Sequence, residues 1–269
     1  MCDARAVTQT GPLLLEPDRA DLSDSLLVLA FSGWSDGGDA ATTALRHLLA
    51  ELPVSPYAQI DTEDFLDFTV ARPQVRLASS GEREVVWPTH EFHSMQHEGD
   101  APDLIVGLGI EPHLRWRSYA EAVIELVRAA NCRRVFMLGA YLDEVIYSQP
   151  VDVTGTASDA QTAAELGLSM SGYEGPTGIV GVLSHALRRA GVASVSLWAR
   201  IPHYVPNRPN ARGALALLLA LQTHTGLRVE LSTLTSDASE FDETVSQLIS
   251  NDPELSAYVR ELKRRAFTQ

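Results

Sequence analysis

The chain has 269 residues, 45% of them hydrophobic and 21% charged, which predicts a globular protein with one large core domain. Its 21 Lys and Arg against 35 Asp and Glu give a formal charge of −14, which argues against nucleic-acid or anionic-membrane partners. Two cysteines are too few for a disulfide scaffold. The sequence shows neither a signal peptide nor an apolar run of roughly 20 residues, the length of a membrane span. We therefore expect a cytoplasmic protein.

Apolar runs alternate with helical patterns along the chain. The runs are rich in Val, Ile, Leu or Phe and lack regular polar alternation, as strands buried on both faces do. The predicted strands are Leu26–Phe31, Leu104–Leu108, Arg134–Leu138 and Ser194–Ala199, and the predicted helices are Ala40–Glu51, Tyr119–Ala130, Thr177–Ala190 and Ala211–Thr223. This alternation predicts an α/β fold with a mostly parallel sheet.

The stretch Phe65–Trp87 has a different pattern. Two alternating runs flank the turn sequence Ser79-Ser80-Gly81-Glu82, which indicates a β-hairpin. We expect this hairpin at the edge of the main sheet.

The pattern changes again after Gly226. Asp237–Ser250 and Pro253–Phe267 predict two helices, with Asp252 as the N-cap and Pro253 as the first residue of the second. Leu248 and Ile249 are expected to face inward in the first helix, as are Leu255, Tyr258, Val259 and Leu262 in the second. We therefore divide the chain into an α/β core domain, 11–226, and a C-terminal helical extension, 227–269, which either packs on the core or contacts a partner.

A glycine-rich turn, residues 33–39, follows the first predicted strand. Ligands of open α/β sheets bind at the carboxyl ends of strands, so Trp34, Asp36, Gly38 and Asp39 are candidate ligand or interface residues. The turn matches neither dinucleotide nor phosphate-loop motifs. The alternative is that Asp36 or Asp39 caps the helix and the glycines shape the turn.

Further candidates follow the other predicted strands or precede a helix. They are Glu111 and Arg115, Glu174 and Thr177, and His203 and Tyr204. Arg115 is expected to pair with Glu111, and His203 is placed to act as a general acid or base, or to be satisfied by a neighbouring carboxylate. No complete set of catalytic residues can be assigned from these spacings.

Three histidines could share one helical face. His90, His93 and His97 would have metal-ligand spacing if the segment 89–98 were helical. The segment is polar and no cysteine or aspartate pattern supports it, so we assign no metal and expect no cofactor.

Five ordered sequence blocks resemble the proteasome assembly chaperone 2 family in its bacterial, actinobacterial-type branch. The blocks are Ala30 to Ala41, Gly109 to Pro112 with Arg115-Trp116, Leu138 to Ala140, Tyr173 to Gly178, and Ser196 to Trp198 through Pro202 to Tyr204. The resemblance implies a three-layer α/β sandwich of the phosphorylase/hydrolase type with a mostly parallel mixed sheet. It also implies a homo-oligomer, a trimer or another assembly, and a role in proteasome assembly.

Two functions stay open. The first is a non-enzymatic interaction or assembly protein whose partners are proteasome subunits or another protein. The alternative is a small-molecule-binding protein or an enzyme of hydrolase or ligase type with an acidic cleft at the strand ends. The family's archaeal docking tail is not matched, because Thr268 stands where those relatives have tyrosine.

We further expect Trp34 and Trp116 to be largely buried.

Overall fold

The computed structural model describes residues 8–97, 99, 101–205 and 209–266, so the tail containing Thr268 lies outside the described residues. Four strands form the parallel centre of the main sheet: β8 (Leu104–Ile110), β3 (Ser25–Ser32), β9 (Cys132–Asp143) and β12 (Ala193–Pro202). All four predicted strands are confirmed, and β9 and β12 run beyond their predicted carboxyl ends. The two extensions pair with each other as far as Asp143 and Pro202.

Shorter strands complete the sheet, whose order over the described residues is β1-β2-β4-β7-β8-β3-β9-β12-β10-β11. On one side the pairing is antiparallel from β8 outward, and on the other β10 is antiparallel to β12. These strands are β1 (Thr8–Thr10), β2 (Leu13–Leu15), β4 (Ser55–Ile60), β7 (His90–Met95), β10 (Val153–Ala157) and β11 (Ser169–Met170). The sheet is therefore mixed with a parallel centre, as predicted.

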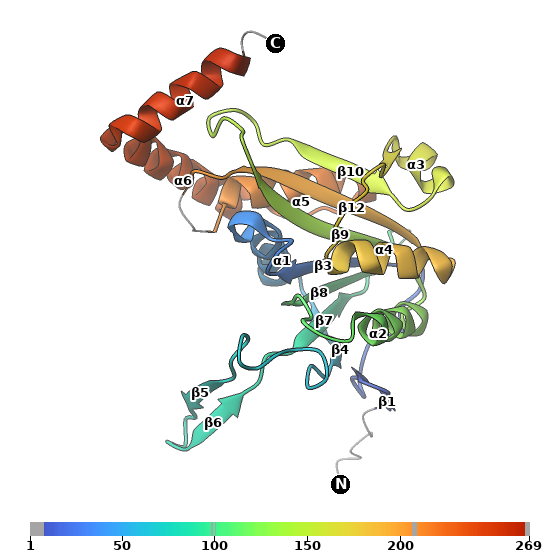
Figure 1. Ribbon diagram of the computed structural model, residues 1–269. Helices are drawn as coiled ribbons and strands as arrows, with labels where there is room; N and C mark the ends of the chain where they lie inside the picture. The colour runs from blue at the N-terminus through green and yellow to red at the C-terminus, as the bar shows by residue number, and fades with distance from the viewer. Residues whose placement is uncertain (1–7, 98, 100, 206–208, 267–269) are drawn as a thin grey trace.

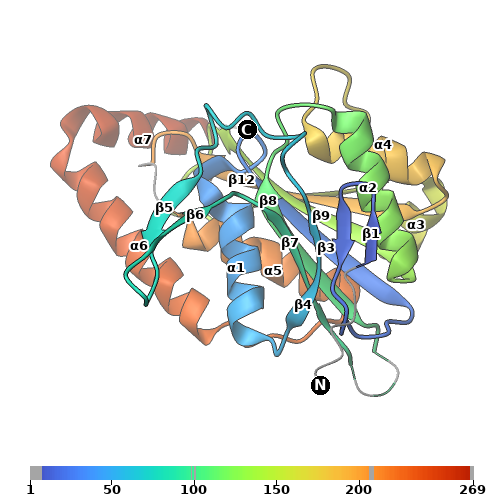
Figure 2. The same cartoon turned by 90° about the horizontal axis from the view of Figure 1, so that it is seen from below.

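Helices cover both faces of the sheet, which gives the predicted three layers (Figures 1 and 2). One face packs against α1 (Ala40–Glu51) and α5 (Ala211–Thr225), and the other against α2 (Trp116–Ala129) and α4 (Ile179–Arg189). The short α3 (Ala160–Leu166) lies by β10 and β11. Alternate residues of a strand point to opposite faces, so each buried strand must be apolar on both sides.

The predicted hairpin is present, but its expected position is wrong. Strands β5 (Gln74–Leu77) and β6 (Arg83–Val86) pair only with each other and form a separate two-stranded sheet. Every residue of both strands is exposed. The hairpin projects from the body as an arm (Figure 1).

The two C-terminal helices are α6 (Ser232–Asn251) and α7 (Pro253–Ala266). Asp252 caps α7 as predicted, since its Oδ1 accepts hydrogen bonds from the N–H groups of Glu254 and Leu255 at 2.9 and 3.0 Å. The start of α6 joins the main core through Leu234, whereas Ile249 packs with α7 in a small cluster of its own. The expectation that Leu248 faces inward is wrong, because that side chain is exposed.

No helix within the described ranges combines the length and the apolarity that crossing a bilayer requires.

Candidate functional site

The glycine-rich turn links β3 to α1 and lies against the end of β9. It includes a short 3₁₀ segment, η1 (Gly37–Asp39), and Gly38 has a φ of 62°, a conformation that glycine adopts without strain. The Ser35 carbonyl accepts a 2.8 Å hydrogen bond from the Ala140 N–H. A Cβ at Gly37 would approach the Tyr141 backbone to 3.2 Å, so the close contact with β9 favours glycine there.

Asp36 caps α1, which agrees with the structural alternative from the sequence. Its Oδ1 accepts hydrogen bonds from the Ala41 and Thr42 N–H groups at 2.7 and 3.2 Å, and Thr42 donates its hydroxyl to Oδ2. Burial raises the pKa of Asp36, although these hydrogen bonds oppose the rise. Asp39 is exposed and makes no capping bond with its side chain.

Glu111 joins the end of β8 to the start of α4. Its Oε1 accepts a 2.8 Å hydrogen bond from the Ile179 N–H, the first residue of α4. An added Cβ at Gly178 would lie 2.7 Å from Glu111 Oε1 and 2.9 Å from Trp34, so the turn, β8 and α4 meet here. A carboxylate at a helix N-terminus is stabilised by the free N–H groups and by the helix dipole.

The expected Glu111–Arg115 pair is wrong. Arg115 begins α2 in a left-handed conformation with φ 52°, and its guanidinium lies 2.6 Å from the Asp64 carboxylate. The expectation for Trp34 is also wrong, since its side chain is 69% exposed. Trp116 is partly buried against the α2 and α4 core and donates its indole N–H to the Pro112 carbonyl.

Glu174 and Thr177 lie in the loop before α4, and both are exposed. Tyr173, in the same loop, is 68% exposed and its hydroxyl donates a 3.0 Å hydrogen bond to the Pro176 carbonyl. A Cβ at Gly181 would clash with the Thr177 hydroxyl at 2.0 Å, so the loop closes tightly onto the first turn of α4.

His203 and Tyr204 belong to a separate aromatic cluster that holds the C-terminal helices. His203 Nε2 lies 2.9 Å from the Tyr258 hydroxyl of α7, and the three rings of His203, Tyr204 and Tyr258 have centroids 5.5 to 5.6 Å apart. The Tyr204 hydroxyl donates to the Val145 carbonyl at 2.8 Å and accepts from the Tyr147 N–H at 2.9 Å. These contacts place both candidates between the end of β12 and α7.

The histidine segment is a strand, β7, so the helical spacing considered for a metal is wrong. His90 is buried on the α2 side with Nδ1 2.6 Å from the Tyr119 hydroxyl, and burial lowers the pKa of this imidazole to about 4. No group of three potential metal ligands occurs in the described part of the chain.

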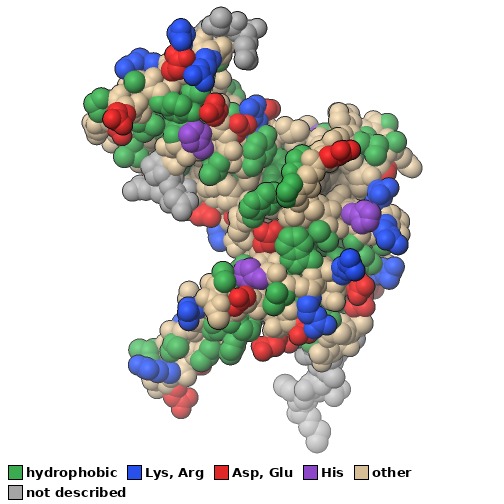
Figure 3. Space-filling model, in the orientation of Figure 1, with side chains coloured by type: hydrophobic (Ala, Val, Ile, Leu, Met, Phe, Trp, Pro, Cys, Tyr) green, Lys and Arg blue, Asp and Glu red, His purple; other side chains and the backbone are tan. Residues whose placement is uncertain are grey.

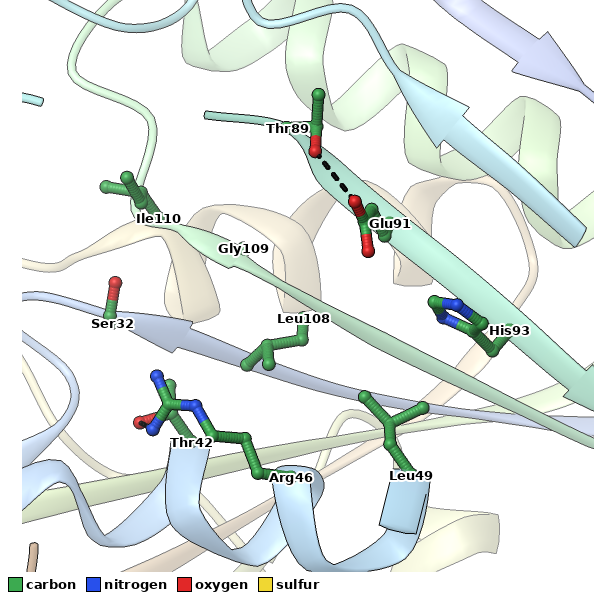
Figure 4. A pocket seen from close by; sticks show the side chains of 10 residues that line it. All are labelled: Ser32, Thr42, Arg46, Leu49, Thr89, Glu91, His93, Leu108, Gly109 and Ile110. Atoms are coloured by element: carbon green, nitrogen blue, oxygen red, sulfur yellow. Dashed lines mark hydrogen bonds between the residues drawn. The ribbon is translucent and has the colours of Figure 1, made fainter. Parts of the chain in front are cut away.

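A depression of about 270 Å³ lies on the other face of β7, beside α1 (Figure 4). Glu91 and His93 line it from β7, and Arg46 lines it from α1. No sequence pattern predicted this depression. Strand alternation across 90–95 would have placed Glu91 and His93 together on the face opposite His90.

Comparisons with known proteins identify the fold and the family. A family model described as the PAC2 family matches residues 30–249. The chain belongs to the PAC2 family. A PAC2 family protein from Streptomyces avermitilis is 41% identical with a TM-score of 0.82, over 88% of this chain and 100% of that one. A proteasome-assembly chaperone homologue from Mycobacterium tuberculosis is 36% identical with a TM-score of 0.78, over 87% and 99%.

The archaeal proteasome activator PbaB from Pyrococcus furiosus shares the fold at 20% identity and a TM-score of 0.68, over 88% of this chain and 97% of that one. The search of curated proteins finds no match. The family resemblance noted in the sequence is therefore confirmed by the family model and by the solved structures.

Proposed function

We propose that this PAC2 family member is a non-enzymatic assembly protein that works as a homo-oligomer in the cytoplasm and binds proteasome subunits. The observation that carries the proposal is the amount of apolar surface exposed at the strand ends and on the hairpin arm. Large apolar side chains that have no cover within the chain mark protein interaction surfaces.

The hairpin arm, β5 and β6, has one largely apolar face. Val75 pairs with Val85 across the hairpin, and Leu77 lies on the same face because alternate strand residues share a side. Trp87, the residue after β6, is 50% exposed. Arg83 pairs with Leu77 at the end of this face, and the opposite face carries the pairs Arg76–Glu84 and Gln74–Val86. A two-stranded hairpin is marginally stable alone, so contact with a partner stabilises this arm.

A second apolar region, here called the strand-end patch, consists of Trp34, Tyr141, Leu142 and Tyr173. Its residues come from the turn after β3, from the end of β9 and from the loop before α4. Figure 3 shows hydrophobic side chains in the hollow between the hairpin arm and the helical arm formed by α6 and α7. A hollow bordered by two arms suits a partner protein better than a small substrate.

The relatives favour the same role. The Mycobacterium tuberculosis neighbour is described as a proteasome-assembly chaperone homologue, and the more distant Pyrococcus furiosus neighbour as a proteasome activator. We extend the proteasome partner from these proteins to this chain. The division into a core, 11–226, and an extension, 227–269, belongs to the proposal, with the extension serving as the second arm.

The alternative of a strand-end enzyme is less well supported. Asp36 and Glu111 cap helices, and His203 hydrogen-bonds to Tyr258. These three candidate acids or bases therefore have structural partners, while Asp39 and Glu174 are exposed carboxylates. Trp34, Gly38, Asp39, Glu174 and Thr177 remain candidate interface residues.

The proposal is tested by affinity capture of proteasome α and β subunits, together with proteasome assembly in a deletion strain. We expect enrichment of the subunits and slower assembly in the deletion. The variant Leu77→Lys should reduce both capture and self-association measured by light scattering. The matched control is Leu219→Lys, at an exposed leucine of α5. No enrichment together with normal assembly in the deletion would refute the proteasome role, and a monomer at every concentration would refute the oligomer.

A further inference from the structure

The depression beside α1 is a surface separate from the strand-end patch and the hairpin arm. Its floor is apolar, made by Leu108 and Ile110 of β8 with Leu49 at one side. Its volume of about 270 Å³ is somewhat below the range of drug-sized sites and suits a small metabolite.

Two opposite charges face this depression from different elements. Arg46 stands on α1 and Glu91 on β7, as Figure 4 shows. Within the described residues Arg46 has no carboxylate within ion-pair distance; its Nη1 donates a 3.2 Å hydrogen bond to the Thr42 hydroxyl. Glu91 likewise has no described cationic partner, and its Oε1 accepts a 3.1 Å hydrogen bond from the Thr89 hydroxyl.

Some other arginines of the chain are paired with a carboxylate. Each of the following has a carboxylate partner: Arg115, Arg133, Arg134, Arg200 and Arg212. In a chain with a formal charge of −14, a cation has many carboxylates available to it. Arg128 and several further arginines also have no ion pair among the described residues, so what distinguishes Arg46 and Glu91 is that two opposite charges without ion pairs line one depression.

Uncharged polar groups add hydrogen-bonding capacity to both walls. Ser32 and Thr42 stand on the Arg46 side, while Thr89 and His93 stand on the Glu91 side. The Nδ1 atom of His93 is buried without a hydrogen-bond partner. That atom and the buried Thr42 hydroxyl are closed to a ligand, so the hydroxyls of Ser32 and Thr89, both on partly exposed residues, supply the added hydrogen-bonding capacity.

We propose that this depression binds a small zwitterion of the α-amino-acid type. The ligand's carboxylate pairs with the Arg46 guanidinium, its ammonium with the Glu91 carboxylate, and its small apolar side chain rests on Leu108. A guanidinium and a carboxylate on opposite walls fix the orientation of a molecule that carries both charges.

Ligands with a single charge fit this site less well. A phosphate or a simple carboxylate would pair with the Arg46 guanidinium but would be repelled by the Glu91 carboxylate. A divalent metal would find Glu91 and His93 without a third protein ligand in the described residues. Only a molecule that carries both charges can pair with both Arg46 and Glu91.

Binding has a second expected consequence. Thr42 accepts from Arg46 and donates to Asp36, so the depression is connected by hydrogen bonds to the cap of α1. A ligand that binds the folded state alone raises its apparent stability in proportion to the logarithm of ligand concentration. Thermal unfolding therefore reports binding without any assumption about activity.

The test is calorimetry and thermal unfolding of the full chain with the standard amino acids at millimolar concentration. Propionate and ethylamine serve as single-charge analogues of alanine. We expect at least one amino acid to bind and neither analogue to match it. Arg46→Gln and Glu91→Gln should each weaken binding by about tenfold or more, because each removes one charged contact.

The matched control is Arg128→Gln, which removes an exposed arginine of α2 and should leave binding unchanged. Glu91 is exposed, so Glu91→Gln provides a folded variant even if Arg46→Gln is unstable. The proposal is overturned if no amino acid binds, if a single-charge analogue binds equally well, or if Glu91→Gln binds with unchanged affinity. Proteasome capture and self-association are independent readouts, so failure of this site leaves the assembly role standing.

Discussion

Replacing Asp36 tests the role of the glycine-rich turn most directly. Asp36→Ala removes the acceptor for the Ala41 and Thr42 N–H groups and for the Thr42 hydroxyl. Loss of a helix cap costs about 0.5–2 kcal/mol, and leaving buried donors unpaired costs about 1–3 kcal/mol. The two ranges count the same N–H groups in part, so we expect a loss of about 2–3 kcal/mol in the free energy of unfolding.

The assay is urea unfolding of wild type, Asp36→Ala, Asp36→Asn and the control Asp39→Asn. Asp36→Asn keeps an oxygen acceptor in place and should lose about 1 kcal/mol, less than the alanine variant. Asp39→Asn should lie within about 0.5 kcal/mol of wild type, because the Asp39 side chain is exposed and caps nothing.

The pH dependence gives an independent check with a definite sign. Burial raises the pKa of Asp36 above its ordinary value of 3.8, so the folded chain holds this proton more tightly than the unfolded chain. The stabilisation from the protonated group is full below 3.8 and is lost as pH rises through the folded pKa. Asparagine does not titrate, so the deficit of Asp36→Asn should shrink from acid to neutral pH.

Two results would refute this reasoning. If Asp36→Ala unfolds at the same urea concentration as wild type, the turn does not depend on its buried carboxylate. If the deficit of Asp36→Asn grows as pH rises, the charged form is the one that the fold favours, and burial does not dominate the pKa.

Two further substitutions test the packing and the helical arm. Tyr258→Phe removes the hydrogen bond to His203 and should lower the local stability of α7 by about 0.5–1.5 kcal/mol. Amide hydrogen exchange in α7 should then be faster than in wild type. Unchanged exchange would contradict a role of this hydrogen bond in holding the helix. Gly109→Ala would place a Cβ 2.1 Å from the His90 ring. Urea unfolding should show a loss near the upper end of about 1–3 kcal/mol, and the control Gly172→Ala, with open space around it, should show little. Equal stability of the two variants would contradict the close packing of β7 on β8.

The central fold could be predicted because its signals are local and strong. The bounds of α1, Ala40–Glu51, match the prediction, since the capped turn before it and the apolar stripe within it both lie in the sequence. The four buried strands were found because strands covered on both faces are apolar throughout. The outer strands have no such run, and β7 in particular was considered as a helix because of its histidine spacing.

The candidate site was predicted less well because its residues are joined by long-range contacts. Glu111 was expected to pair with Arg115, four residues away, but it caps a helix that begins 68 residues later. The exposure of Trp34 depends on which distant segments pack against the turn, and no local sequence pattern predicts those contacts. Arg46 and Glu91 line one depression only because α1 packs over β8, the strand that neighbours β7 in the sheet.

The β5–β6 arm is separable from the rest of the fold. Its strands are exposed throughout and hydrogen-bond to no strand of the main sheet. Mutations in those strands therefore have little effect on the folding of the core. Within a family that keeps one scaffold, such an arm can diverge in sequence and length and so change the choice of partner while the scaffold stays the same. It is also the natural place to graft a new binding sequence onto this chain.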